Sequence, residues 1–265
     1  MIACRAVNTC VVFKRATNLF FNEEKRLSKA KRLRRQHQHE GNTINFQQAV
    51  KTRHIELIPK SRNQEKYILD LLDTSKHIVI GHGPAGTGKT YLAMQAAIKA
   101  FRNHECDKIV LTRPAVGVED EKHGFLPGTL EQKMEPWTRP LFDILRLYYN
   151  AKEIQHFIEE GVIEISPLAF MRGRTFNNSW IVADEMQNAT PGQVKMLMTR
   201  IGEHSKIVIT GDIEQADRQG ANNGLLDLCN RLTETSVHGM SVCGFEGKDI
   251  QRHPIIDSVL NLYRD

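Results

Sequence analysis

Cysteine is scarce in this chain of 265 residues, and long apolar runs are missing. The five cysteines are an odd number and form no Cys-x-x-Cys pair, which argues against a disulfide framework and against a zinc site. Lys14 and Arg15 interrupt the apolar patch at residues 10–13, so neither a signal-peptide core nor a membrane span is expected there. We therefore expect a protein that works in a reducing, cytoplasmic setting without a membrane partner.

Positive charge is concentrated at the start of the chain. Residues 1–63 hold 14 of the 36 lysines and arginines but 4 of the 31 acidic residues. Residues 23–40 contain no proline or glycine and almost no apolar face, which predicts a basic helix that cannot pack into a core. We predict that residues 1–55 form a basic extension, partly helical or disordered, and that residues 56–265 form the main domain. Such an arm suits the phosphate backbone of a nucleic acid, and an ordinary solvated helix is the open alternative.

No internal repeat or low-complexity tract is present, and short apolar runs alternate with helical patterns. Each run is continuous rather than alternating, which is typical of strands covered on both faces. This order predicts an α/β fold, a doubly wound and mainly parallel sheet with helices on both faces. The predicted strands are residues 77–80, 108–112, 162–166, 180–183 and 206–210, and the predicted helices are residues 90–101, 190–201, 224–232 and 255–263.

A glycine-rich segment between a predicted strand and a predicted helix matches the pattern G-x-x-x-x-G-K-[ST]. Its residues are Gly83, Pro84, Ala85, Gly86, Thr87, Gly88, Lys89 and Thr90. The glycines let backbone N–H groups turn toward phosphates, and the start of the following helix adds a positive field. We expect Lys89 to hold the β and γ phosphates of ATP and Thr90 to ligate Mg²⁺. A chance glycine-rich turn is the alternative.

Carboxylates follow the predicted strand at 180–183. Asp184 and Glu185 should emerge at the carboxyl edge of the sheet beside the phosphate loop. There Asp184 can hold Mg²⁺ through water, and Glu185 can polarise the water that attacks the γ-phosphate. A capping pair for the next helix is the alternative. Gln215, after the following strand, can sense the γ-phosphate or orient the water, although Gly-Asp after a strand is also an ordinary turn.

Two further polar residues are candidates on weaker patterns. Gln64 precedes the first predicted strand, and a glutamine amide can pair with N6 and N7 of adenine. Arg252 stands on a predicted loop before a proline and can reach a γ-phosphate as an arginine finger. Either residue can equally be an ordinary surface side chain.

Taken in order along the chain, seven motifs resemble those of the PhoH-like family over about residues 60–263. They are GPAGTGKT at 83–90, TRPAV at 112–116, GFLPG at 124–128, FMRGRTF at 170–176, VADEMQN at 182–188, TGDIEQ at 210–215 and QRHP at 251–254. The resemblance implies a RecA-like P-loop core related to superfamily 1 helicases, ATP binding and hydrolysis, and RNA or DNA as a partner. PhoH-like proteins are associated with phosphate starvation, and similar copies are frequent in bacteriophages.

The resemblance also implies roles for individual residues. Matching positions are Gly83, Gly86, Gly88, Lys89 and Thr90 in the phosphate loop, Asp184 and Glu185 at the metal and the water, and Gln215 at the γ-phosphate. Gln64 gains support, because related helicases place a glutamine upstream for adenine. Arg252 matches the family's Arg-His-Pro motif, and a homo-oligomer, possibly a hexameric ring, would bring it to a neighbour's ATP. An arginine that anchors its own loop is the alternative.

Arginines and aromatic residues in the remaining motifs are candidates for contact with nucleic acid. The arginines are Arg113, Arg172 and Arg174, and the aromatic residues are Phe125 and Phe170. Charge and base stacking would be the means of contact. For the two phenylalanines we favour a place in the core, and for the arginines pairing with surface acids is equally open.

The leading hypothesis is an oligomeric ATPase that moves on, or remodels, single-stranded RNA or DNA. A small-molecule P-loop kinase is a second class, but the adjacent acids and Gln215 favour water as the acceptor. A nucleotide switch or scaffold with little turnover is the third. The chain has no room for the PIN nuclease domain that some relatives carry, so nuclease activity is not implied.

Overall fold

The computed structural model describes residues 54–114, 139–215, 223–251 and 255. Six strands form one sheet in the order β3-β2-β4-β5-β1-β6, and each neighbouring pair is parallel. They are β1 (Ile78–His82), β2 (Lys108–Thr112), β3 (Ile163–Ile165), β4 (Ser179–Ala183), β5 (Lys206–Gly211) and β6 (Met240–Gly244). Because β5 lies between β1 and β4, the strand order is that of a RecA-like core.

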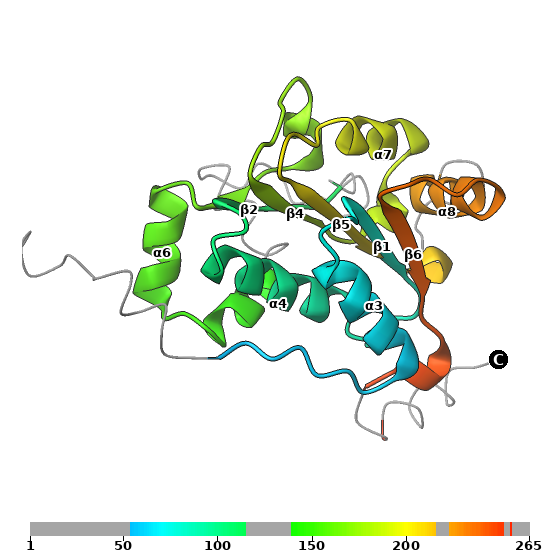
Figure 1. The fold of residues 1–265 in the computed structure, drawn as a ribbon, viewed down its shortest axis with the longest axis horizontal. Helices are drawn as coiled ribbons and strands as arrows, with labels where there is room; N and C mark the ends of the chain where they lie inside the picture. The colour runs from blue at the N-terminus through cyan, green and yellow to red at the C-terminus, as the bar shows by residue number, and fades with distance from the viewer. Residues whose placement is uncertain (1–53, 115–138, 216–222, 252–254, 256–265) are drawn as a thin grey trace, which may run out of the picture. The chain divides into compact units, whose positions relative to one another are not determined.

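Helices cover both faces of the sheet, as Figure 1 shows. On one face lie α3 (Arg62–Leu72), α4 (Lys89–Arg102) and α6 (Ala151–Glu159), and on the other lie α7 (Pro191–Met198) and α8 (Gly224–Glu234). Short 3-10 helices are η1 (Leu168–Met171), η2 (Met186–Asn188), η3 (Ile213–Gln215) and η5 (Gly247–Asp249). Residues 139–146 are also helical. The predicted α/β doubly wound architecture is confirmed.

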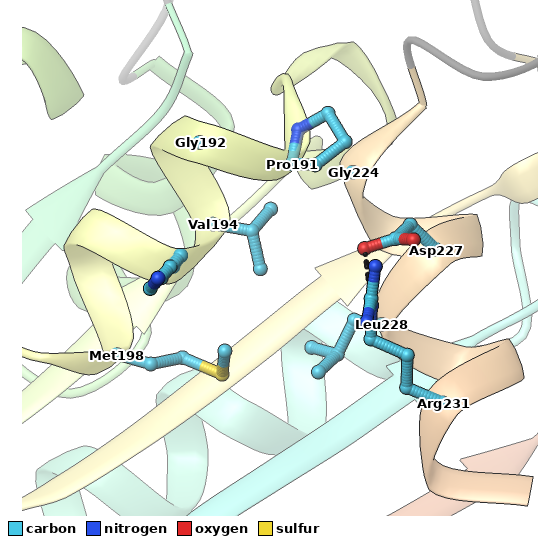
Figure 2. Close-up of a pocket in the computed structure, with 9 residues that line it drawn as sticks. Pro191, Gly192, Val194, Met198, Gly224, Asp227, Leu228 and Arg231 are labelled. Carbon is cyan, nitrogen blue, oxygen red and sulfur yellow. Dashed lines mark hydrogen bonds and ion pairs between the residues drawn. The ribbon is translucent and has the colours of Figure 1, made fainter. Parts of the chain in front are cut away.

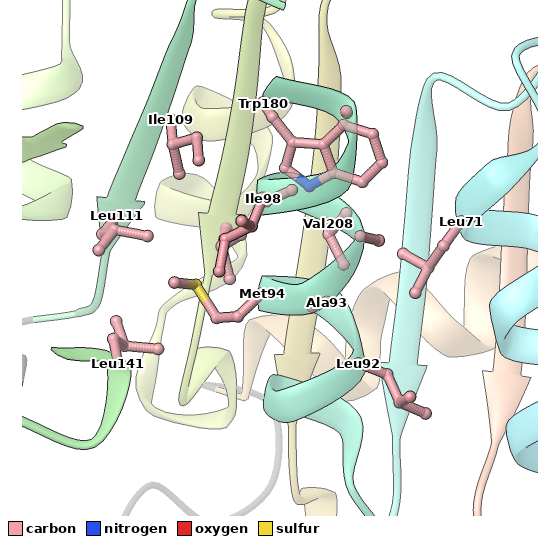
Figure 3. Close-up of a cluster of buried hydrophobic side chains, with 14 of the residues drawn as sticks. Leu71, Leu92, Ala93, Met94, Ile98, Ile109, Leu111, Leu141, Trp180 and Val208 are labelled. Carbon is pink, nitrogen blue, oxygen red and sulfur yellow. The ribbon is translucent and has the colours of Figure 1, made fainter. Parts of the chain in front are cut away.

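Alternate residues of β1, β2, β4, β5 and β6 pack into two separate apolar clusters. On β1, Val79 belongs to the apolar cluster with α3 and α4, whereas Ile78 and Ile80 belong to the cluster with α7 and α8. Figure 3 shows part of the first cluster, where α4 packs on the sheet; the labelled residues include Leu92, Met94, Ile98, Ile109, Leu111, Trp180 and Val208. Strands buried on both faces explain why the sequence shows continuous apolar runs rather than alternation.

The five predicted strands are confirmed to within two residues at each end, and the sixth strand was missed. Strand β6 (Met240–Gly244) is an edge strand whose first three residues are only half buried. A half-buried edge strand needs no continuous apolar run, and this one ends in glycine, so its sequence resembles a loop. Helices α3 and α6 and the helix at residues 139–146 were also missed. Of the predicted terminal helices, residues 23–40 and 256–263 lie outside the described part of the chain.

The helix α7 begins where the sequence predicts a start. Thr190 accepts a hydrogen bond from the N–H of Gln193, whose side chain accepts one from the N–H of Thr190, with Pro191 in the first turn. This capping box satisfies N–H groups that a helix start otherwise leaves unpaired. In the part of the chain that the structure describes, no helix is long and apolar enough to cross a membrane.

A cavity of about 400 Å³ lies between α7 and α8 (Figure 2). Its walls include Val194, Met198 and Leu228, and an ion pair of 2.9 Å joins Asp227 to Arg231 along α8. The helices meet closely at Gly224, where an added Cβ would lie 2.6 Å from the carbonyl carbon and oxygen of Thr190. A glycine is therefore required where α8 begins against α7.

Alanine at Gly224 is expected to lower the free energy of unfolding by about 1–3 kcal/mol, because the new methyl group meets backbone that cannot rotate away. Urea denaturation followed by circular dichroism measures the change. The matched control is Gly192→Ala in α7, where the nearest atom to an added Cβ is the Thr190 hydroxyl at 4.0 Å. Equal unfolding midpoints for the two variants would contradict the packing argument.

Candidate nucleotide-binding site

The phosphate loop leaves β1 and enters α4 through backbone that favours glycine. Gly83, Gly86 and Gly88 have φ angles of 133°, 86° and 83°. The Gly83 N–H donates to the Gly211 carbonyl at the end of β5 (3.2 Å). A Cβ on Gly83 would lie 2.3 Å from the Phe245 carbonyl oxygen, just after β6. The loop is thus held by the strands on both sides of β1.

Lys89, the first residue of α4, turns back into the loop. Its ammonium donates to the carbonyls of Gly83 (2.6 Å) and Pro84 (2.7 Å), and it lies 3.3 Å from the Thr87 hydroxyl. The side chain is buried. A buried cation surrounded by loop carbonyls is well placed to exchange them for phosphate oxygens.

Asp184 follows β4 and is 2% exposed. Its Oδ1 accepts hydrogen bonds from Thr90 (2.7 Å) and Thr210, and its Oδ2 accepts from the guanidinium of Arg113, with Nε at 3.1 Å. The Asp184 N–H donates to the Thr112 carbonyl (3.0 Å), which ties β4 to β2 beside the loop. The Thr90 hydroxyl and the Asp184 carboxylate lie in contact, and both offer oxygen atoms as metal ligands. Oxygen ligands fit a Mg²⁺ ion that arrives bound to phosphates.

Glu185 has an exposed side chain and a left-handed backbone conformation (φ 57°) that is uncommon outside glycine. Its carboxylate accepts a hydrogen bond of 2.6 Å from the Gln187 amide, and the Gln187 oxygen accepts one of 3.1 Å from the Asp212 N–H. Gln187 is buried and joins the ends of β4 and β5. Sequence reasoning assigned it no role, although it lies within the motif at 182–188. The left-handed backbone of Glu185 is locally strained, and this strain fixes the direction of the Glu185 carboxylate.

These groups converge on one cavity of about 490 Å³ at the carboxyl edge of the sheet. Its lining residues are Ala85, Gly86, Gly88, Lys89, Thr90, Tyr91, Arg113, Pro140, Ile144, Asp184, Glu185, Gly211, Asp212 and Gln215. The apolar wall of the cavity is formed by Tyr91, Pro140 and Ile144. The sequence did not identify these residues, because no local motif marks them. The structure thus brings together Lys89, Thr90, Asp184, Glu185 and Gln215.

Comparison with known proteins matches residues 56–264 to the family model for PhoH-like protein. The chain belongs to the PhoH-like family. It is 42% identical over 216 residues to a PhoH-like protein of Synechocystis sp., covering 81% of this chain and 64% of that one. It is also 42% identical over 205 residues to a PhoH-like protein of Bacillus subtilis (77% of this chain, 63% of that one).

A more distant relative is Protein PhoH of Escherichia coli, 38% identical over 192 residues (71% of this chain, 53% of that one). The chain therefore spans less than two thirds of the length of these relatives. Among solved structures, the SWI2/SNF2 ATPase core of Sulfolobus solfataricus in complex with dsDNA has a TM-score of 0.35 at 14% identity. It covers 65% of this chain and 37% of that one, an overlap too slight to bear on function.

In this PhoH-like chain, Gln64 lies behind the phosphate loop and is not among the residues that line the cavity. Its amide donates to the Thr87 carbonyl (3.0 Å), and its oxygen accepts from the Lys60 N–H (2.7 Å). The side chain is 4% exposed and therefore supports the loop from α3. Adenine recognition by Gln64 stays a prediction.

The arginines proposed for nucleic acid have different surroundings. Arg174 forms an ion pair with Glu164 on β3, and its guanidinium carbon lies 4.5 Å from the centre of the Phe176 ring. For Arg174 the structure therefore shows the alternative given above, pairing with an acidic residue. Arg172 is exposed. Arg113 lies inside the cavity, against Asp184. Contact of these arginines with nucleic acid stays a prediction.

The expectation that Phe170 is a core residue is wrong, because its side chain is 60% exposed. In the 3-10 helix η1, residues three apart share a face, so Leu168 and Met171 point into the core and Phe170 points out. Phe125 and Arg252 lie outside the described residues. The neighbouring Gln251 donates its N–H to the Gly86 carbonyl (2.9 Å), so residue 251 contacts the phosphate loop.

His82, the last residue of β1, lies under the loop. Burial lowers the pKa of its imidazole, the nearby Lys89 ammonium lowers it further, and Asp212 acts in the opposite direction. A histidine with a pKa below its ordinary value is neutral at neutral pH. Neutral His82 therefore adds no second positive charge next to the Lys89 ammonium.

Proposed function

We propose that this PhoH-like chain is an ATPase that binds Mg²⁺ and ATP in the cavity beside the phosphate loop. The observation that carries the proposal is the convergence of Lys89, Thr90, Asp184, Glu185 and Gln215 on that cavity. Hydrolysis of the terminal phosphoanhydride of ATP requires a cation, oxygen ligands for a metal and a carboxylate that can reach the attacking water.

Each residue has a separate task in this proposal. Lys89 would exchange the loop carbonyls for the β and γ phosphates. Thr90 and Asp184 would hold Mg²⁺, which would neutralise charge on the phosphates. Glu185 would accept a proton from the attacking water while the water oxygen bonds to the γ-phosphorus. The bond between the γ-phosphorus and the β–γ bridging oxygen breaks at the same time, and ADP leaves. The Gln187 amide keeps the Glu185 carboxylate in place. Gln215 orients the water or senses the γ-phosphate.

Single-stranded RNA or DNA is the proposed partner, supported by the basic composition of residues 1–63. A homo-oligomeric ring is the proposed assembly, with Arg252 acting on a neighbour's ATP. Because Gln251 lies on the phosphate loop of its own chain, action of Arg252 on its own ATP is the alternative.

Steady-state ATP hydrolysis with Mg²⁺ tests the proposal, with and without single-stranded RNA and DNA, at low and moderate salt. We expect Lys89→Ala to abolish turnover, because the phosphates lose their buried cation. The 265-residue chain with glutamine at Lys31, Arg32, Arg34 and Arg35 should show weaker stimulation by nucleic acid, most clearly at moderate salt. Turnover that survives Lys89→Ala would overturn the ATPase proposal. Turnover that depends on Lys89 but ignores every nucleic acid would overturn the partner alone.

A further inference from the structure

Arg113 occupies the position beside Asp184 that a metal ion would approach. Its Nε donates to Asp184 Oδ2 at 3.1 Å and its Nη2 donates to the same oxygen. The Arg113 side chain is 17% exposed and the Asp184 side chain 3%. Among the described residues that line the cavity, Lys89 and Arg113 carry the positive charges.

The carboxylate of Asp184 has no acceptor capacity to spare. Four donor groups fill it, two hydroxyls on Oδ1 and two guanidinium nitrogens on Oδ2. The Thr90 hydroxyl can remain beside the carboxylate when a metal binds, since both are oxygen ligands. The guanidinium would be repelled by the metal ion, whether Asp184 holds that ion directly or through water, because two cations would lie close together in a poorly solvated site.

The backbone around Arg113 is anchored to two other segments. The Arg113 carbonyl accepts from the Leu168 N–H (3.3 Å), and the carbonyl of the preceding Thr112 accepts from the Asp184 N–H (3.0 Å). A fixed backbone and a long side chain that lines an open cavity allow the guanidinium to turn without moving β2. A desolvated guanidinium that leaves one anion needs another to replace it.

We propose that Arg113 is the resident counter-cation of Asp184, that it yields this place to Mg²⁺, and that it then binds the terminal phosphate of ATP. This inference rests on the proposed nucleotide site. ADP with Mg²⁺ displaces the guanidinium but offers it no γ-phosphate, whereas ATP with Mg²⁺ supplies both the displacing metal and the new anion. Arg113 therefore makes the site discriminate ATP from ADP.

Nucleotide binding by the full-length protein tests this role. The dissociation constants of ATP and ADP are measured by isothermal titration calorimetry over a range of Mg²⁺ concentrations, for the wild type, Arg113→Met and Arg113→Lys. For Arg113→Met we expect the preference for ATP over ADP to fall roughly tenfold or more, the size of one charge-assisted contact. The Mg²⁺ concentration that half-saturates ADP binding should also fall, because no guanidinium competes for Asp184. Arg113→Lys should retain part of the preference.

The matched control is Arg146→Met, which removes an exposed arginine paired with Asp143 on the helix at 139–146. Both quantities should be unchanged in it. A purely structural Arg113 would lower the thermal unfolding midpoint of Arg113→Met and leave the ATP preference and the Mg²⁺ dependence as in the wild type, which overturns the inference. If the wild type binds neither nucleotide, the nucleotide site itself is refuted, and the Arg113 role with it.

Discussion

Replacement of Glu185 by glutamine is expected to lower the rate of ATP hydrolysis by roughly 10²- to 10⁴-fold, the usual contribution of a general base. ATP affinity should stay within about threefold of the wild type, because the amide keeps the shape of the side chain and loses only its ability to take a proton. Glu185 has this role in our proposal because its left-handed backbone and its 2.6 Å hydrogen bond from Gln187 hold the carboxylate at the cavity. Phosphate release under saturating ATP measures the rate, and calorimetry measures the affinity.

Glu214→Gln is the matched control, since Glu214 is another exposed carboxylate at the same edge of the sheet but does not line the cavity. Its hydrolysis rate should equal that of the wild type. If both glutamine variants hydrolyse ATP at the wild-type rate, Glu185 is not the base. The chain is then better described as a nucleotide switch if its wild-type turnover is also slow.

Alanine at Gly83 is expected to lower the free energy of unfolding by about 3 kcal/mol or more, from backbone strain and overpacking together. At a φ angle of 133° the backbone of any residue other than glycine is strained. The new Cβ would also lie 2.3 Å from the Phe245 carbonyl oxygen. Neither β1 nor the segment after β6 can retreat easily, because the Phe245 N–H donates to the His82 carbonyl (2.8 Å). Urea denaturation measures the loss, and nucleotide binding should weaken with it.

Gly247→Ala is the control for that variant, since nothing lies within 4 Å of an added Cβ there. Its stability should match the wild type. A Gly83→Ala protein as stable as Gly247→Ala would mean that the loop tolerates a side chain, and that the glycine serves phosphate contact alone.

The phosphate loop and the acids after β4 could be predicted because their chemistry is local. A loop that turns N–H groups toward phosphate needs glycines at set spacing, and Asp184 follows its strand directly. Edge strand β6 and the exposed ring of Phe170 could not be predicted in the same way. Strand β6 forms because it pairs with β1. The ring of Phe170 is exposed because Leu168 and Met171 take the inward-facing positions of η1.

By itself the sequence determined the α/β class, the positions of five strands along the chain and the segments that carry charge for phosphate and metal. Periodicity and glycine spacing encode these features within a few residues of one another. Only the tertiary structure decided that Arg113 faces Asp184, that Gln187 accepts a hydrogen bond from the N–H of Asp212 and that Gln64 supports the loop from behind. Those contacts join different elements, and a side chain's partner across a parallel sheet depends on strand order and register, which no local pattern specifies.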